Sequence, residues 1–132
     1  MHTPVSGTPR LLLRLEGLVV LVASIAAYAA IDGSWTLFAL LLLVPDLAMI
    51  GYLSGPRVGA ITYNAVHTYA APALVGVLAY AGLLEGGWRY CLIWIAHIAM
   101  DRALGFGLKF SSAFADTHLG VAGGAGRFAT RP

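Results

Sequence analysis

The sequence predicts an all-α fold, a bundle of four transmembrane helices with the N- and C-termini in the cytoplasm. Three observations predict it. Of the 132 residues, 59% are hydrophobic and 11% are charged, with a mean hydropathy of +0.80, whereas a soluble domain carries about 25% charged residues. Apolar segments recur along the chain, each near the roughly 20 residues that a spanning helix needs. Basic residues gather at alternate ends of these segments, as the positive-inside rule requires.

The four apolar segments are expected at about 11–31, 35–53, 58–84 and 88–108. Asp32-Gly33-Ser34 has the composition of a turn and separates the first two. Pro56 ends the second segment, because proline cannot continue a helix, and Gly86-Gly87 precedes the fourth. Pro72 predicts a kink within the third segment. One membrane domain is therefore expected over 1–120, followed by a flexible glycine-rich tail over 121–132.

The distribution of basic residues predicts the orientation and the location. With four spans, the N-terminus, the middle connection and the C-terminal tail share one side, which carries Arg10, Arg14, Arg57, Lys109, Arg127 and Arg131. The other side has only Arg89, so both termini should be cytoplasmic in a multi-pass protein of the bacterial cytoplasmic membrane. The first segment also resembles a secretory signal, but three further spans favour an uncleaved helix. A net charge of +2 gives no reason to expect a nucleic-acid partner.

Polar side chains interrupt the apolar segments at a shared depth. His67 should lie roughly 13 Å from the cytoplasmic face, at about 1.5 Å per residue, and Asp101 about 10 Å from it. Ionisable groups are costly in hydrocarbon, so they face the interior of a bundle and mark function by default. The sequence therefore predicts one polar site in the cytoplasmic half, formed by Asp46, Asn64, His67, His97, Asp101 and Arg102.

The chemistry of this set stays open at the level of sequence. His97 and Asp101 are spaced i,i+4 and Asn64 and His67 are spaced i,i+3, so each pair should share a helix face. Two imidazoles and two carboxylates suit zinc or iron, with candidate ligands His67, His97, Asp101 and Asp46. The same groups suit metal-free acid–base work, and Arg102 would compete with a metal for the carboxylates. Buried structural pairs, His97 with Asp101 and Asp46 with Arg102, are the third interpretation.

The leading hypothesis is an enzyme that acts on a hydrophobic or lipid-like small molecule from the cytoplasmic leaflet. We expect His97 to be the general acid or base, Asp101 to orient it, and His67 to be a second proton carrier or ligand. Asp46 would be a second carboxylate, Asn64 a hydrogen-bond donor to developing charge, and Arg102 an anion stabiliser. Hydrolysis and isomerisation both fit, and no nucleophile motif is present.

Two other functions are compatible with the sequence. Asp46, His67 and His97 could relay protons in a small proton-coupled transporter, although the outer half is almost wholly apolar. A non-catalytic factor that binds a lipid or a partner helix is the other alternative. Faces rich in alanine and glycine, such as 23–30, would allow a homodimer.

Two further features each have a functional and a structural interpretation. Pro45 either opens the helix locally and aims Asp46 at a pocket, or is a tolerated kink. Asp116 and His118 either cap the cytoplasmic mouth of the site or belong to a solvated tail.

The residues of the polar site occur, together with their neighbours, in a characteristic order along the chain. The sequence has Pro45-Asp46-Leu47, Gly51-Tyr52, Gly55-Pro56, Tyr63-Asn64, His67, His97-Ile98, Asp101-Arg102, Gly107-Leu108-Lys109 and Thr117-His118-Leu119-Gly120. In this combination the chain resembles the small bacterial integral membrane proteins known as domain of unknown function 4260, over about 11–120. The resemblance implies a compact membrane protein with four helices. It implies no activity.

Overall fold

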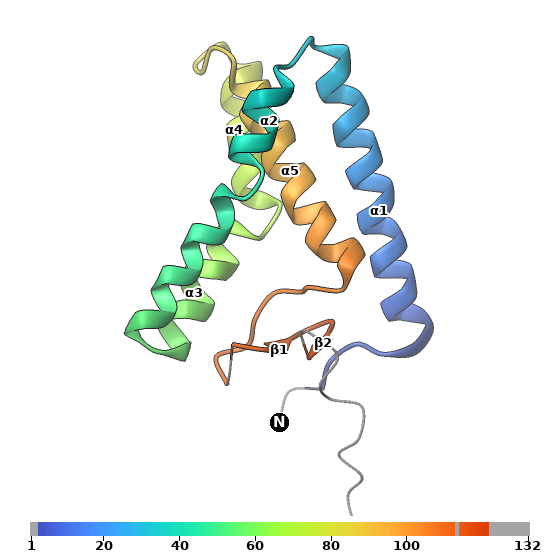
Figure 1. The fold of residues 1–132 in the computed structure, drawn as a ribbon, viewed down its shortest axis with the longest axis vertical. Coiled ribbons are helices and arrows are strands. Elements are labelled where there is room, and N and C mark those ends of the chain that lie inside the picture. The colour runs from blue at the N-terminus through green and yellow to red at the C-terminus, as the bar shows by residue number, and fades with distance from the viewer. Residues whose placement is uncertain (1–2, 113, 122–132) are drawn as a thin grey trace, which may run out of the picture.

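The chain folds predominantly into helices in a computed structural model that describes residues 3–112 and 114–121 (Figure 1). The elements, in chain order, are α1 (Gly7–Ala30), α2 (Trp35–Leu41), the 3₁₀ helix η1 (Val44–Ser54), α3 (Pro56–Val66), α4 (Ala70–Tyr80), α5 (Gly87–Leu104), β1 (Asp116–Thr117) and β2 (Gly120–Val121). The two short strands pair antiparallel. The helical class predicted from composition is confirmed. Of the predicted tail, Val121 belongs to β2 and 122–132 lie outside the described residues.

Two packed pairs organise the helices. α1 packs along α5, and η1 packs against α3. α4 packs on α5 beyond the end of α3, while α2 has only a small contact with α5. Figure 1 shows the η1–α3 pair and the α1–α5 pair spreading apart toward the end where the β1–β2 hairpin lies. The hairpin and the segment before it therefore occupy the space between the diverging pairs.

The close contact of α1 with α5 depends on a small residue. A Cβ atom on Gly17 would lie 2.7 Å from Cβ of Arg102 and 2.8 Å from the backbone nitrogen of Ala103. Small residues let helix backbones approach in this way, especially where packing rather than the hydrophobic effect joins helices. The other end of α1 is fixed by Tyr28, which is fully buried and whose hydroxyl donates to the Ser34 carbonyl at 2.8 Å.

Two stretches, Gly7–Ala30 and Trp35–Ser54, are long and apolar enough to cross a membrane. Only 17% of the most apolar window in the first stretch is buried, and 0% in the second. The core helix of a soluble protein would bury its apolar side chains, whereas these two stretches expose most of theirs.

The second apolar segment is not one α-helix. α2 ends at Leu41, and η1 begins at Val44 with Pro45 in its first turn. Runs of 3₁₀ helix beyond three or four residues are uncommon and often mark strain or a functional position. Thr62 of α3 donates to the Ala48 carbonyl at 3.0 Å and so ties α3 to η1. Asp46 consequently sits in a locally tightened helix just after a break.

The third segment breaks at a different place from the one expected. α3 ends at Val66, His67 caps it through its backbone N–H to the Tyr63 carbonyl at 3.0 Å, and α4 begins at Ala70. Pro72 lies in the first turn of α4, where its missing N–H is not needed. The break therefore falls at His67 and not at Pro72. The fourth helix also ends earlier than expected, because Gly105 has a φ of 92° and caps α5 in the left-handed conformation.

Candidate metal centre

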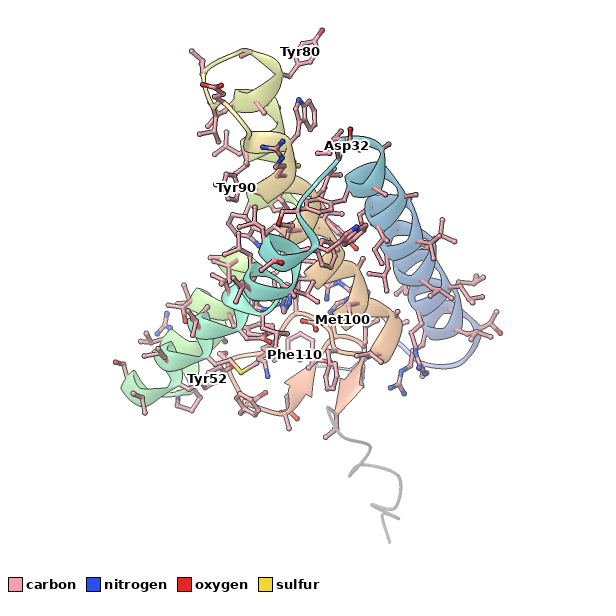
Figure 2. The ribbon with its side chains drawn as sticks, turned by 45° about the horizontal axis from the view of Figure 1, so that its top comes forward. Asp32, Tyr52, Tyr80, Tyr90, Met100 and Phe110 are labelled. Carbon is pink, nitrogen blue, oxygen red and sulfur yellow. The ribbon has the colours of Figure 1, made fainter. Side chains whose placement is uncertain are left out.

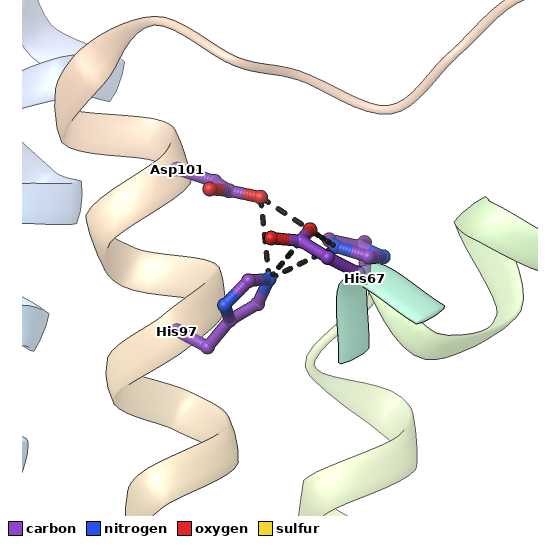
Figure 3. Close-up of side chains that lie close together, drawn as sticks. His67, His97 and Asp101 are labelled. Atoms are coloured by element: carbon purple, nitrogen blue, oxygen red, sulfur yellow. Dashed lines mark hydrogen bonds and ion pairs between the residues drawn. The ribbon is translucent and has the colours of Figure 1, made fainter. Parts of the chain in front are cut away.

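Four side chains from three parts of the chain bring one donor atom each into a single cluster. Asp46 comes from η1, His67 from the break between α3 and α4, and His97 and Asp101 from α5. All four donor atoms lie within 4.8 Å of one another. Figure 3 shows His97 and Asp101 directed from α5 toward His67. We call these four residues the donor cluster.

The spacing of the donor atoms matches the spacing around a metal ion. Nε2 of His97 lies 3.0 Å from Nε2 of His67. Oδ1 of Asp46 lies 3.3 Å from Nε2 of His67 and 3.4 Å from Nε2 of His97. Oδ2 of Asp101 lies 3.6 Å from Nε2 of His67 and 3.5 Å from Nε2 of His97. A tetrahedral zinc ion has bonds of about 2.0–2.1 Å, which places its ligand atoms about 3.3–3.4 Å apart. The five separations that involve a histidine nitrogen are close to this spacing, and the two carboxylate oxygens lie within 4.8 Å of each other.

His67 is held in the tautomer that a metal ligand needs. Its Nδ1 lies 2.8 Å from the Tyr63 carbonyl, which can only accept a hydrogen bond, so we assign the ring proton to Nδ1. Nε2 then carries a lone pair directed into the donor cluster. A backbone carbonyl that fixes the second nitrogen is the usual support of a metal-bound histidine. Nδ1 of His97 is buried and has no hydrogen-bond partner among the described residues.

Burial makes the charge of the donor cluster expensive. The side chains of His97 and His67 are 0% and 2% exposed, Asp101 is 13% exposed, and Asp46 is the most open at 35%. Two carboxylates beside two buried imidazoles leave negative charge that needs compensation. Within the described chain, every ion pair of the two carboxylates is with a histidine and none is with arginine or lysine. A divalent cation would neutralise this charge.

Tyr63 supports the donor cluster from one side. Its ring stacks on the His67 ring, with centroids 3.6 Å apart and an interplanar angle of 10°. Its hydroxyl donates to Oδ2 of Asp101 at 3.3 Å. One buried residue therefore contacts two of the four donors and, through its carbonyl, fixes the tautomer of one of them. The sequence alone offers a tyrosine in this region but no sign of the stacking.

Two of the six residues expected in the polar site lie outside the donor cluster. Asn64 donates from Nδ2 to the Lys109 carbonyl at 2.8 Å and accepts the Lys109 N–H at 2.7 Å. Arg102 donates from Nη2 to the His67 carbonyl at 3.0 Å. The Asp46–Arg102 pair does not form in the part of the chain that the structure describes, while His97 and Asp101 do pair. Asn64 and Arg102 thus hold backbone around the cluster.

The C-terminal segment, described over 105–112 and 114–121, contacts Tyr63 through Lys109. Lys109 is 7% exposed, and its Nζ donates to the Phe114 carbonyl at 2.7 Å and lies 4.7 Å from the Tyr63 ring centroid. Burial lowers the pKa of Lys109, while the negative charges of Asp101 and Asp46 oppose this. Asp116 accepts from Ser112 at 2.7 Å. Asp116 and His118 therefore fasten this segment instead of reaching the donor atoms.

We expect His118 to make the attachment of this segment pH-dependent. Its Nδ1 accepts the Leu108 N–H at 2.8 Å, and its carbonyl accepts the Val5 N–H at 2.8 Å. Burial and the nearby Arg102 charge lower the pKa of His118 below its usual 6.5. Folding therefore favours the neutral ring. The stabilisation is complete above pH 6.5 and is lost as the pH falls through the lowered folded-state pKa.

We expect amide exchange in 105–121 to accelerate as the pH falls below 6.5, after correction for the intrinsic exchange rate. Hydrogen–deuterium exchange with mass spectrometry would measure it. His118→Gln retains an acceptor but does not titrate near neutral pH, so it should remove the pH dependence. An identical pH profile in this variant would assign the effect to another group.

Fold and site together define a helical protein with two segments able to cross a membrane and a buried His/Asp donor cluster. The chain belongs to the family described as Domain of unknown function (DUF4260), which matches residues 10–122. The matched stretch contains all four donors, and the family predicted from the sequence is confirmed. No curated protein and no solved structure matches the chain.

Proposed function

We propose that this protein is a four-span metalloenzyme of the bacterial cytoplasmic membrane that acts on a hydrophobic or lipid-like substrate. The observation that carries the proposal is the convergence of His67, His97, Asp101 and Asp46 at distances suited to one metal ion. The sequence left metal-assisted and metal-free acid–base chemistry open. The spacing of the donor atoms, and the absence of a close ion pair between either carboxylate and an arginine or lysine within the described chain, favour the metal.

The arrangement of the chain supports four spans. α1, α2 with η1, α3 with α4, and α5 would each cross once, the second and third as broken helices. Figure 2 shows Asp32, in the turn after α1, and Tyr80, at the end of α4, at one end of the molecule, and Tyr52 and Phe110 toward the other. The segment before α1 pairs with the C-terminal segment through Val5 and His118. This second end carries the basic residues and would face the cytoplasm.

The topology has a direct test. We expect a reporter enzyme fused after Pro132 to be active in the cytoplasm, and a reporter inserted at Gly86 to be active only in the periplasm, because basic residues stay on the cytoplasmic side. Paired fusions of alkaline phosphatase and green fluorescent protein give both measurements. Cytoplasmic activity at both positions would contradict four spans.

The donors divide by exposure into two roles. We assign His67, His97 and Asp101, the three most buried, to hold the metal, because catalytic zinc sites use three protein ligands and keep one position open. The ion would supply a Lewis acid for a carbonyl or phosphoryl oxygen. Asp46, the most exposed, would act as the general base that takes a proton from water.

An apolar groove beside the donor cluster suits a hydrophobic substrate. Its volume is about 410 Å³, and its lining includes Leu41, Val44, Pro45, Ala48, Val66 and Trp94. Pro45 and Val66 directly precede Asp46 and His67 in the chain. Substrate pockets commonly have volumes of about 300–1,000 Å³ and are lined mostly by apolar side chains. A hydrocarbon chain lying here would present its polar end near Asp46.

Metal removal tests the function. Purified protein would be stripped with a chelator, reloaded with zinc or iron, and incubated with phospholipids, lipid phosphates and fatty-acid esters, with products identified by mass spectrometry. We expect turnover only in the reloaded protein. Asp46→Asn should retain the metal and lose turnover, while Asp116→Asn, a carboxylate outside the cluster, should lose neither. Turnover that survives metal removal, or Asp46→Asn with full activity, would overturn the proposal.

One observation favours a second candidate, a transporter. The helices that carry Asp46 and His67 are both broken beside these residues, and broken helices form the binding sites of many secondary transporters. Proteoliposomes with an internal pH dye or a metal-sensitive dye would detect such transport. Flux that requires His67 and His97, without product formation, would favour this function over the enzyme.

A further inference from the structure

Two arginines of α1, which do not belong to the donor cluster, lie against the end of α5. A Cβ atom on Gly105 would lie 3.6 Å from Nη2 of Arg10 and 3.7 Å from Nε of Arg14. A Cβ atom on Gly120 would lie 3.4 Å from Cζ of Arg10. Both guanidinium groups therefore flank Gly105, and Arg10 also reaches the β1–β2 hairpin.

The backbone that meets these arginines is specialised. Gly105 and Gly120 have φ values of 92° and 116°, in the left-handed region that favours glycine. Gly105 ends α5, and Gly120 begins β2. The guanidinium of Arg10 is thus positioned by two chain turns and not by a helix face alone.

Among the described residues, no carboxylate forms an ion pair with either of these arginines. Arg14 donates from Nε to the Ala103 carbonyl at 2.9 Å. The Arg10 side chain makes no hydrogen bond within the described residues, and its Nε is buried without a partner there. None of the ion pairs found in the described chain includes an arginine. A partly buried guanidinium with unused donors is costly unless an anion completes it.

We propose that Arg10 and Arg14 form a binding site for a phosphate group at the cytoplasmic end of α1. Guanidinium groups bind phosphate through paired hydrogen bonds, so two adjacent arginines suit one phosphate. The site lies in the first turns of the apolar helix Gly7–Ala30, the depth at which anionic headgroups meet a spanning helix. The phosphate belongs to an anionic phospholipid or is free inorganic phosphate.

Thermal stability of the purified protein in mild detergent tests the site. Phosphatidylglycerol, uncharged diacylglycerol and inorganic phosphate would each be titrated against the intact chain. A ligand that binds only the folded state raises the melting temperature with its concentration. We expect phosphatidylglycerol or phosphate to stabilise the wild type and diacylglycerol to have no effect. If phosphatidylglycerol stabilises the protein and inorganic phosphate does not, the site binds a lipid headgroup. If phosphatidylglycerol and inorganic phosphate both stabilise it, the site recognises the phosphate group itself.

Arg10→Gln is the decisive variant because the Arg10 side chain has no hydrogen bond to lose within the described chain. We expect it to raise the half-saturating ligand concentration about tenfold, the usual effect of losing one charged hydrogen-bonding group. Arg57→Gln, an exposed arginine at the start of α3, is the matched control and should respond as the wild type does. An unchanged response in Arg10→Gln, or no stabilisation by either phosphate compound, would overturn the proposal. Metal content is unaffected in either case, so this test is separate from that of the metal centre.

Discussion

Replacing His97 with alanine is expected to remove the metal from the protein. Nε2 of His97 lies within 3.5 Å of all three other donor atoms, so its loss leaves a gap that no neighbouring side chain fills. Loss even of a supporting residue around a metal costs about 10–100-fold in affinity, and loss of a ligand should cost at least about 100-fold. Elemental analysis should find near one equivalent of zinc or iron in the wild type and less than about a tenth in the variant.

Matched variants separate ligation from damage to the fold. Asp116→Asn removes a carboxylate outside the donor cluster and should retain the metal. Tyr63→Phe removes the hydrogen bond to Asp101 but keeps the ring that stacks on His67, so it should weaken binding by only about tenfold. If the wild type, freshly purified and then reloaded, holds no metal, the donor cluster is a hydrogen-bonded network and the metalloenzyme proposal fails.

Replacing Asn64 with leucine is expected to release the C-terminal segment while leaving the helices in place. The side chain of Asn64 makes two hydrogen bonds to the backbone of Lys109, at 2.8 Å and 2.7 Å. Leucine is similar in size and makes neither bond, so the N–H and the carbonyl of the buried Lys109 both lose this partner. The cost should be about 2–4 kcal/mol in the stability of this segment. Hydrogen–deuterium exchange should show faster exchange in 105–121 than in α5.

The companion variants show what Asn64 does. Asn64→Asp still accepts the Lys109 N–H but places a carboxylate oxygen against the Lys109 carbonyl, so its effect should be similar in direction. Metal content should stay near that of the wild type in both variants, because Asn64 lies outside the donor cluster. Loss of metal from Asn64→Leu with an intact C-terminal segment would show that Asn64 acts on the metal directly.

The sequence predicted the donor cluster well where a continuous helix carries it. His97 and Asp101 are one turn apart in α5 and meet as the i,i+4 spacing requires. Asp46 and His67 were recognised because ionisable residues are rare in apolar segments. Their approach to α5 depends on packing between elements far apart in the chain, which a single sequence does not encode locally.

Periodic reasoning says less where the helix stops. Asn64 and His67 were expected to share a face, but α3 ends at Val66 and His67 adopts the capping conformation, with a φ of −107°. The two side chains therefore point to different partners. The β1–β2 hairpin was also missed, since its strands are two residues long and depend on partners such as Val5 and Leu108.

The divergence of the two helix pairs would give a bound metal a mechanical role. Asp46 and His67 belong to one arm, η1 with α3, and His97 and Asp101 belong to the other, α5 with α1. A single ion bonded to all four, or to three with Asp46 beside it, would act as a cross-link between the arms. Its binding energy would then become part of the energy that holds the arms at a fixed angle. The supply of metal in the cell would in this way set how rigid the protein is.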